Sequence, residues 1–341
     1  MSQIPQILFH SQMPLDKPRM MVRNSDDFFP GIPTSHPWHI FVNAHNSLLT
    51  CHLNILPDWD MFQTSHPYSG FHAAGRCVSG GPIYITDEPG QHNISLINEM
   101  TASTTKGKTI ILRPPIIGKT VEMYTAYEEE RLLKVGTFTG GKGGTGILAL
   151  FNISERILSE LVNISAFPGI ESNEEYIVRA HSTGEISRSM RLDSEIPVVS
   201  LEVDIKGYEI LSAYRLRSFE LRSVSTKTIP STKVAILGLL GKMTGAAAVT
   251  SCDMKLGNNG KLQIEVSLKA LGLLGIYISS VPEMSVERDF LITISEMVIP
   301  MHTVRICMEK PVLEIDVEKA WNEMQIQPGF SNELTLKIFL R

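Results

Sequence analysis

Hydrophobic and polar positions alternate in two different ways along the chain, and the change falls near residue 105. In residues 1–105, short apolar runs alternate with stretches whose apolar side chains recur three or four residues apart, the spacing of one helix face. The clearest such stretch covers residues 38–52, with Pro37 in its first turn. We expect further helices at residues 70–78 and 93–100, and strands at residues 6–9, 20–22, 54–56 and 82–86.

Strands and helices in alternation predict right-handed parallel βαβ units. Acidic residues follow or end three of the expected strands, at Asp26 and Asp27, at Asp58 and Asp60, and at Asp87. In a (β/α)8 TIM barrel the carboxyl ends of the strands form the active-site face, and the whole barrel takes about 250 residues. Residues 1–105 therefore suffice only for the last three or four strand-helix units of such a barrel, together with active-site loops.

Residues 106–341 have the pattern of a β-rich domain. Short β-branched or aromatic runs are separated by glycine, asparagine and proline, and Asn259-Gly260 is a hairpin signal. We expect a C-terminal antiparallel β-sandwich domain with a single helix at residues 316–324. Its strands are expected at residues 109–112, 146–153, 176–180, 198–203, 216–224, 261–268, 290–297, 303–308 and 334–340.

Composition excludes several classes of protein. The chain has 341 residues and a formal net charge of −5, so it has no basic excess of the kind that nucleic-acid binding requires. No apolar stretch is long enough to span a membrane, and the N-terminus lacks the pattern of a secretory signal. The four cysteines form no CxxC pair, which favours reduced thiols over a zinc site or a disulfide framework. We therefore expect a cytoplasmic protein that binds neither nucleic acid nor membranes.

Two acidic clusters are the candidate chemistry. Glycoside cleavage needs two carboxyl groups on opposite sides of one bond, about 5–5.5 Å apart in retaining enzymes. Asp26 or Asp27 can supply one of them, and Arg23, four residues before Asp27, can bind a carboxylate or sugar hydroxyls. A plain loop or helix cap explains the same acids, and spacing alone leaves both interpretations open.

The segment Asp58-Trp59-Asp60-Met61-Phe62 combines two acids with large apolar groups. Strand alternation would point Asp58 and Asp60 to the same side. Acids beside an aromatic ring suit a sugar, which has hydroxyl edges and apolar ring faces. A barrel strand with one capping acid is about as good an explanation of the pattern.

Other motifs are weaker. His36, His39 and His45 can share a helix face, but packing explains them better than a metal site, because no HExxH or His-x-His is present. The glycine-rich runs at residues 140–144 and 238–244 miss the spacing of a phosphate-binding loop and favour turns. No Gly-x-Ser-x-Gly elbow indicates a serine hydrolase. We expect neither a cofactor nor a metal.

Five motifs in a fixed order resemble one known family. They are RNSDDFFP at residues 23–30, PDWDMFQ at 57–63, FHAAGR at 71–76, SGGPIYITD at 79–87 and GQHN at 90–93. The sequence resembles the raffinose synthase and seed imbibition protein group of glycoside hydrolase family 36. The likeness covers essentially the whole chain, but only the C-terminal portion of the family's usual length.

The resemblance implies a retaining α-galactosidase or galactosyltransferase of carbohydrate metabolism, acting on raffinose-family oligosaccharides through a galactosyl-enzyme intermediate. It implies Asp27 as the acid/base, with Asp26 as the fallback. The substrate-binding residues that it implies are Arg23, Asp58, Trp59, Asp60, Met61 and Asp87, with Asp87 the weakest of them.

The family's nucleophile, an aspartate on the fourth barrel strand, has no counterpart here, because Asp16 follows the wrong kind of segment. We therefore expect this chain to carry the acid/base half of an α-galactoside site. The alternative is an inactive truncated remnant or a β-rich interaction module, with pairing of a partner at the open barrel edge. Hydrolysis and galactosyl transfer are not distinguished by the sequence, and neither are the donor and acceptor sugars.

Overall fold

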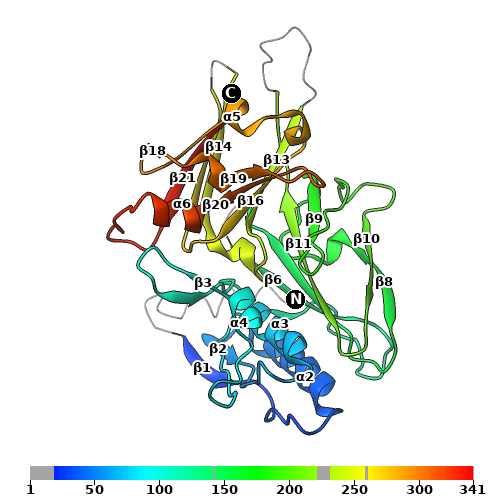
Figure 1. The fold of residues 1–341 in the computed structure, drawn as a ribbon. Helices are drawn as coiled ribbons and strands as arrows, with labels where there is room; N and C mark the ends of the chain where they lie inside the picture. Colours follow the sequence, from blue (N-terminus) through cyan, green and yellow to red (C-terminus); the bar gives the residue numbers. More distant parts are fainter. Residues whose placement is uncertain (1–18, 141–142, 221–230, 258–259, 341) are drawn as a thin grey trace.

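A computed structural model describes residues 19–140, 143–220, 231–257 and 260–340. Several features named above lie wholly or partly outside these residues. They are the strand expected at residues 6–9, Asp16, part of the glycine-rich run 140–144 and part of the Asn259-Gly260 turn. Figure 1 shows strands β1 and β2 and helices α2, α3 and α4 gathered at one end of the molecule, with the antiparallel sheets beyond them.

The first unit is a parallel βαβ unit, as predicted. Strand β1 (Met20–Arg23) is followed by helix α2 (Ser35–Thr50) and strand β2 (Ile55–Asp58). The two strands pair in parallel, and the last residue of one, Arg23, is in register with the last residue of the other, Asp58. Because parallel strands end at the same edge, both side chains emerge at the carboxyl end of this sheet.

A second helical connection follows. Helix α3 (Ser69–Ser79) and helix α4 (Ile94–Met100) confirm the helices expected at residues 70–78 and 93–100, and Asn93 caps α4 by accepting a hydrogen bond from the Leu96 amide. The strand expected at residues 82–86 is reduced to one parallel bridge between Ile85 and Phe62. Next to α4, β3 (Thr101–Ser103) and β4 (Thr109–Ile111) form a short hairpin.

A five-stranded antiparallel sheet packs against α3. Its central strand β7 (Gly146–Phe151) is buried at all six positions, because α3 covers one face and a two-stranded sheet covers the other. The Phe71 and Phe151 rings meet at 5.4 Å across the first of these contacts. In sheet order the strands are β5 (Lys119–Thr120), β6 (Leu133–Phe138), β7, β11 (Tyr208–Arg215) and β9 (Tyr176–Ala180), and the covering pair is β8 (Leu158–Asn163) and β10 (Val198–Val203).

Two further five-stranded sheets enclose a separate hydrophobic core. Strand β15 (Leu262–Leu268) alternates buried and half-buried positions along its length, as its sequence predicts. One sheet contains β12 (Arg217–Phe219), β13 (Thr232–Leu239), β16 (Leu273–Ile278), β20 (Val312–Asp316) and β19 (Val304–Ile306). The other contains β14 (Val249–Leu256), β15 (Leu262–Leu268), β21 (Leu334–Leu340), β17 (Phe290–Ile294) and β18 (Met297–Val298).

Helices are few in this second part. Helix α6 (Val317–Glu323) confirms the helix expected at residues 316–324, with Asp316 as its N-cap. The expectation of a single helix was wrong, because the four-residue helix α5 (Val286–Asp289) is also present. Within the described residues, four 3-10 turns complete the elements, at Ile164–Ala166, Gly245–Ala248, Val281–Glu283 and Met301–Thr303.

The described chain is thus an α/β segment followed by antiparallel β-sheets. None of its four cysteines is in a disulfide. Among the described residues, no helix combines the length and the apolar character that crossing a membrane demands.

Candidate active site

Arg23 joins the ends of the two parallel strands. Its Nη2 atom lies 2.8 Å from Asp27 Oδ1 and 2.5 Å from Asp60 Oδ2, so one guanidinium nitrogen bridges two carboxylates. Asp27 comes from the loop after β1 and Asp60 from the loop after β2. The structure therefore brings together the three residues that the sequence placed in one site.

Asp60 is the buried member of this cluster, with 6% of its surface exposed. Its backbone has the left-handed φ of 64°, and its amide donates to Asp58 Oδ1 at 2.9 Å. Its own Oδ2 accepts a hydrogen bond from the Phe28 amide at 2.6 Å. Strand alternation does not set the orientation of Asp60, because β2 ends at Asp58 and a turn follows it.

The loop after β1 is anchored by Asn24, which is buried. The Asn24 amide donates to the Asp58 carbonyl at 2.9 Å, and its side-chain nitrogen donates to the Asn43 carbonyl at 2.8 Å and to Ser47 Oγ at 3.2 Å. Asn46 donates back to the Asn24 carbonyl at 2.8 Å. Helix α2 thus fixes the start of the loop after β1, between Arg23 and Asp27.

The structure distinguishes the two neighbouring acids. Arg23 contacts the carboxylate of Asp27 but only the backbone carbonyl of Asp26, at 3.4 Å. The Asp27 side chain is 72% exposed and faces solvent beside the buried Asp60. Asp27 is therefore the acid of this pair that belongs to the cluster.

Met61 and Trp59 flank Asp60 in the sequence but lie in different environments. Met61 is 37% exposed, so its thioether is accessible to a ligand. The Trp59 ring has no exposed surface, and its Nε1 donates to Ser47 Oγ of α2 at 3.0 Å. The expectation that Trp59 flanks the binding pocket is therefore corrected: this ring packs beneath the cluster, where a substrate does not reach it.

Asp87 has a local role. Its carboxylate accepts hydrogen bonds from Thr64 Oγ1 at 3.0 Å and from the Ser65 amide at 2.8 Å. Partial burial alone would raise the pKa of Asp87, but these hydrogen bonds outweigh it and lower the pKa below its ordinary value. Both carboxylate oxygens are engaged in holding a turn, in keeping with its place as the weakest of the binding candidates.

Arg76 of α3 lies wholly buried beneath the cluster, and sequence reasoning gave it no role. Its Nε donates to the Asp60 carbonyl at 3.2 Å, and its Nη2 donates to the Met61 carbonyl at 3.1 Å. The other contacts are to two histidine rings, His72 Nδ1 at 2.8 Å and His39 Nε2 at 3.0 Å. His72 in turn contacts His36, with 2.7 Å between His72 Nε2 and His36 Nδ1.

Burial sets the charge state of this group. Burial, and then the charge of Arg76, lowers the pKa of His39 to about 3 and that of His72 well below its ordinary value. Burial, and then the charge of His66, lowers the pKa of His36 to about 4. Burial also lowers the pKa of Arg76, to about 9, although the carboxylates of Asp60 and Asp58 act in the opposite direction. At neutral pH the histidines are therefore neutral and the arginine is charged.

The sequence held a partial signal for this group. His36 and His39 are three residues apart on α2, and His72 and Arg76 are four residues apart on α3, so each pair shares a helix face. The expectation that His36 and His39 serve packing is correct as far as burial goes, since both are buried. The contact between the two helices, and hence the Arg76 contacts, could not be read from spacing.

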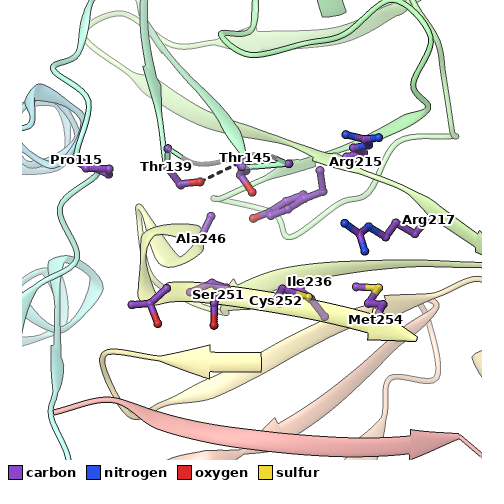
Figure 2. Close-up of a pocket in the computed structure, with 16 residues that line it drawn as sticks. Pro115, Thr139, Thr145, Arg215, Arg217, Ile236, Ala246, Ser251, Cys252 and Met254 are labelled. Carbon is purple, nitrogen blue, oxygen red and sulfur yellow. Dashed lines mark hydrogen bonds between the residues drawn. The ribbon is translucent and has the colours of Figure 1, made fainter. Parts of the chain in front are cut away.

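A cavity of about 530 Å³ lies elsewhere, between the sheet that packs on α3 and strand β14. Figure 2 shows Thr139, Thr145, Arg215 and Arg217 on one side of it and Ser251, Cys252 and Met254 on the other. None of the predicted site residues lines this cavity. Within the described ranges, no three His, Cys, Asp or Glu side chains are grouped so as to hold a metal ion.

Comparison with known families locates the match in the first part of the chain. Residues 1–154 match the family described as raffinose synthase or seed imbibition protein Sip1. All five sequence motifs fall within these residues, together with Arg23, Asp27, Asp60 and Arg76.

Two curated relatives illustrate the similarity. A probable galactinol–sucrose galactosyltransferase 1 of Arabidopsis thaliana is 27% identical over 294 residues, which are 77% of this chain and 36% of that protein. A galactinol–sucrose galactosyltransferase of Pisum sativum is 45% identical over 83 residues, 22% of this chain and 10% of that protein. The chain spans about a third of the length of the first of these relatives.

Among solved structures, the α-galactosidase of Saccharomyces cerevisiae with raffinose matches with a TM-score of 0.40 and 9% identity. The match covers 58% of this chain and 58% of that chain.

Proposed function

We propose that this chain, which belongs to the raffinose synthase or seed imbibition protein family, carries the acid/base half of a site that processes α-galactosides. The reaction is retaining hydrolysis or galactosyl transfer on raffinose-family oligosaccharides. The relatives named as galactinol–sucrose galactosyltransferases support transfer from galactinol to sucrose as the first reaction to test.

We place this site on the last strands of a (β/α)8 barrel formed by residues 1–105, with residues 106–341 as the β-rich domain behind it. The parallel pairing of β1 with β2 and the parallel bridge between Phe62 and Ile85 support consecutive barrel strands joined by α2 and α3. Arg23 and Asp58 at the strand ends then lie on the face where barrel enzymes bind their substrates.

One observation carries the proposal: Arg23 bridges an exposed carboxylate, Asp27, and a buried one, Asp60. An exposed acid can meet a leaving group, whereas a buried acid held by fixed donors suits the recognition of sugar hydroxyls. Asp58 holds the turn that orients Asp60, and Met61 offers an exposed apolar surface beside it.

The proposed chemistry assigns Asp27 two steps. Asp27 first gives a proton to the glycosidic oxygen while the bond from that oxygen to the galactosyl carbon breaks. A second carboxylate, which we do not find in this chain, attacks the same carbon and forms a galactosyl ester. Asp27 then takes the proton of a water molecule or of a sugar hydroxyl, whose oxygen bonds to the galactosyl carbon while the bond from that carbon to the second carboxylate breaks.

A second candidate function is that of an inactive remnant or interaction module, with a partner pairing at the open barrel edge. Strand β1 is hydrogen-bonded to β2 on one side only within the described residues, and its Met20 and Met21 side chains are 66% and 54% exposed. Unpaired edges with apolar side chains favour pairing with another strand.

The deciding experiment uses the purified 341-residue protein with p-nitrophenyl α-galactoside, and separately with galactinol in the presence and absence of sucrose. Turnover supports the first candidate, and sucrose-dependent product formation identifies transfer. Because the second carboxylate is not found in this chain, the absence of turnover alone does not decide between the candidates. Folded protein that neither turns over these substrates nor binds galactinol would leave the remnant or interaction module as the better account.

Asp27→Asn tests the acid/base role, with Asp26→Asn as the matched control one residue away. We expect Asp27→Asn to lower kcat for substrates with poor leaving groups by about 10²–10⁴-fold, the usual contribution of general acid–base catalysis. Asp26→Asn should retain activity, since only its backbone contacts Arg23. Equal losses in both variants would remove Asp27 from its proposed role.

A further inference from the structure

We propose that Arg76 is a positioning residue for the candidate site, and that neutral His72 and His39 hold its side chain in place. Its role in catalysis rests on the proposed function, whereas its role in shaping the turn after β2 does not. Arg76 touches no part of the reacting groups and acts through the backbone of Asp60 and Met61.

The donors of Arg76 are fully engaged. Nε donates to the Asp60 carbonyl, Nη2 to the Met61 carbonyl and to His39 Nε2, and Nη1 to His72 Nδ1 and, at 3.4 Å, to the His72 carbonyl. A guanidinium group has five N–H bonds in a rigid fork, and here there are five acceptors. No carboxylate lies within ion-pair distance of Arg76 among the described residues, so neutral acceptors alone satisfy this buried cation.

The guanidinium group of Arg76 explains the shape of the turn after β2. Two consecutive carbonyls, those of Asp60 and Met61, point to one side of the chain, toward Arg76. Asp60 adopts a φ of 64°, a conformation that is costly for a residue with a side chain. In that conformation its carboxylate contacts the Phe28 amide and Arg23 rather than Arg76. Arg76 therefore stabilises the backbone that presents Asp60 to the site.

The contacts also fix the tautomers of the histidines. Arg76 can only donate, so His72 Nδ1 accepts and the His72 proton lies on Nε2. His72 Nε2 then donates to His36 Nδ1, which places the His36 proton on Nε2. His36 Nε2 is buried and has no hydrogen-bond partner among the described residues. The order of donors therefore runs in one direction, from Arg76 through His72 to His36.

His39 serves as the second acceptor from the other helix. Its Nε2 lies 3.0 Å from Arg76 Nη2 and also 3.1 Å from the Trp59 carbonyl oxygen. One ring nitrogen cannot accept from Arg76 and donate to the Trp59 carbonyl at the same time, so only one of these contacts is a hydrogen bond. As the acceptor of Arg76, Nε2 is unprotonated, which places the His39 proton on Nδ1. Helices α2 and α3 thus each supply one imidazole to the guanidinium, and the turn after β2 is held to both.

Two measurements on the 341-residue protein test this inference without turnover. Nitrogen-15 NMR of the wild-type protein should show His72 as the Nε2–H tautomer. Hydrogen exchange should show the amides of residues 60–62 opening about tenfold or more faster in Arg76→Met than in wild type, since a lost buried hydrogen bond is a factor of about ten in an equilibrium. Arg131→Met, a surface arginine paired with Glu122, is the matched control and should leave these amides unchanged.

Arg76→Lys is the second variant, to be used if Arg76→Met does not fold. Lysine keeps the positive charge, but its single ammonium group cannot span both carbonyls. Its exchange at residues 60–62 should lie between wild type and Arg76→Met. A His72 proton on Nδ1, or unchanged exchange in Arg76→Lys, would overturn the inference.

Kinetics test the catalytic consequence separately. If wild-type protein cleaves p-nitrophenyl α-galactoside, Arg76→Lys should raise KM by about tenfold and change kcat less, the pattern of lost ground-state binding. A roughly tenfold fall in kcat with unchanged KM would overturn the positioning role. If wild-type protein neither cleaves p-nitrophenyl α-galactoside nor binds galactinol, the proposed function fails, while the exchange and NMR results still decide the role of Arg76 in the turn.

Discussion

Two arginines contact different groups of Asp60 and are satisfied in different ways. Arg23 is 41% exposed and binds the carboxylates of Asp27 and Asp60. Arg76 is wholly buried and binds three carbonyls and two imidazoles. The first can exchange its partners for those of a ligand, because its own side chain is open to solvent. The second cannot, because each partner it loses stays buried and unsatisfied.

This difference separates recognition from scaffolding within one site. Asp60 takes part in both recognition and scaffolding, since its carboxylate contacts Arg23 and its carbonyl contacts Arg76. The comparison predicts that changes at Arg76 act mainly on stability, and that changes at Arg23 act mainly on substrate.

The largest effect on stability is expected for Arg76→Met. The variant leaves the carbonyls of Asp60 and Met61 without donors in the interior, and such groups cost about 1–3 kcal/mol each. We expect the free energy of unfolding to fall by about 3 kcal/mol, measured by urea denaturation at pH 7. A loss no greater than that of Arg131→Met would contradict the scaffolding role.

A pH-dependent effect of intermediate size is expected from the histidines around Arg76. The pKa of His36 is lowered to about 4 and that of His39 to about 3, both below the ordinary value of 6.5. The unfolded chain therefore binds more protons than the folded one as the pH falls below about 6.5. Stability should be full above that pH and should fall progressively toward pH 4 and below.

Urea midpoints measured from pH 7.5 to pH 4 test this. Carboxylates also titrate toward the lower end of that range, so the informative quantity is the difference between variants. His39→Gln should reduce the pH dependence, whereas His302→Gln, at an exposed position, should leave it unchanged. Identical pH profiles in the two variants would show that the buried histidines do not control acid stability.

The smallest effect on stability is expected for Arg23→Met. The exposed Arg23–Asp27 pair contributes about 0–1 kcal/mol. The buried Asp60 carboxylate keeps the Phe28 amide as a donor when Arg23 is removed. We expect a change in the free energy of unfolding below about 1 kcal/mol, together with a loss of p-nitrophenyl α-galactoside turnover of about tenfold or more. A large loss of stability with normal turnover would reverse the assignment of the two arginines.

The prediction from sequence was best where local pattern decides structure. Strands 176–180, 198–203 and 334–340 were placed at their observed bounds, because turn residues bracket them. Strand β14 was missed because it is largely exposed and lacks a continuous apolar run. Strand β11 was missed because its polar Glu209 and Ser212 interrupt its apolar positions, and both are buried against neighbours.

The candidate site was likewise predicted from sequence only where local pattern decides its structure. The order of Arg23, Asp27, Asp58 and Asp60 after two short strands follows from the sequence, because parallel strands bring their carboxyl ends to one edge. The fate of Trp59 does not follow, since the same ring suits a sugar platform and a core contact. Only the packing of α2 against β2 buries it against Ser47.

The sequence by itself determined the parallel strand-helix unit, the acids at its edge and the β-rich character of the remainder, because hydrophobic periodicity and turn chemistry are local. The tertiary structure alone decided that Asp27 rather than Asp26 meets Arg23, and that Arg76 binds the turn from beneath. Both depend on which side chains two helices and two loops bring within 3 Å of each other, and that depends on packing between segments far apart in the chain.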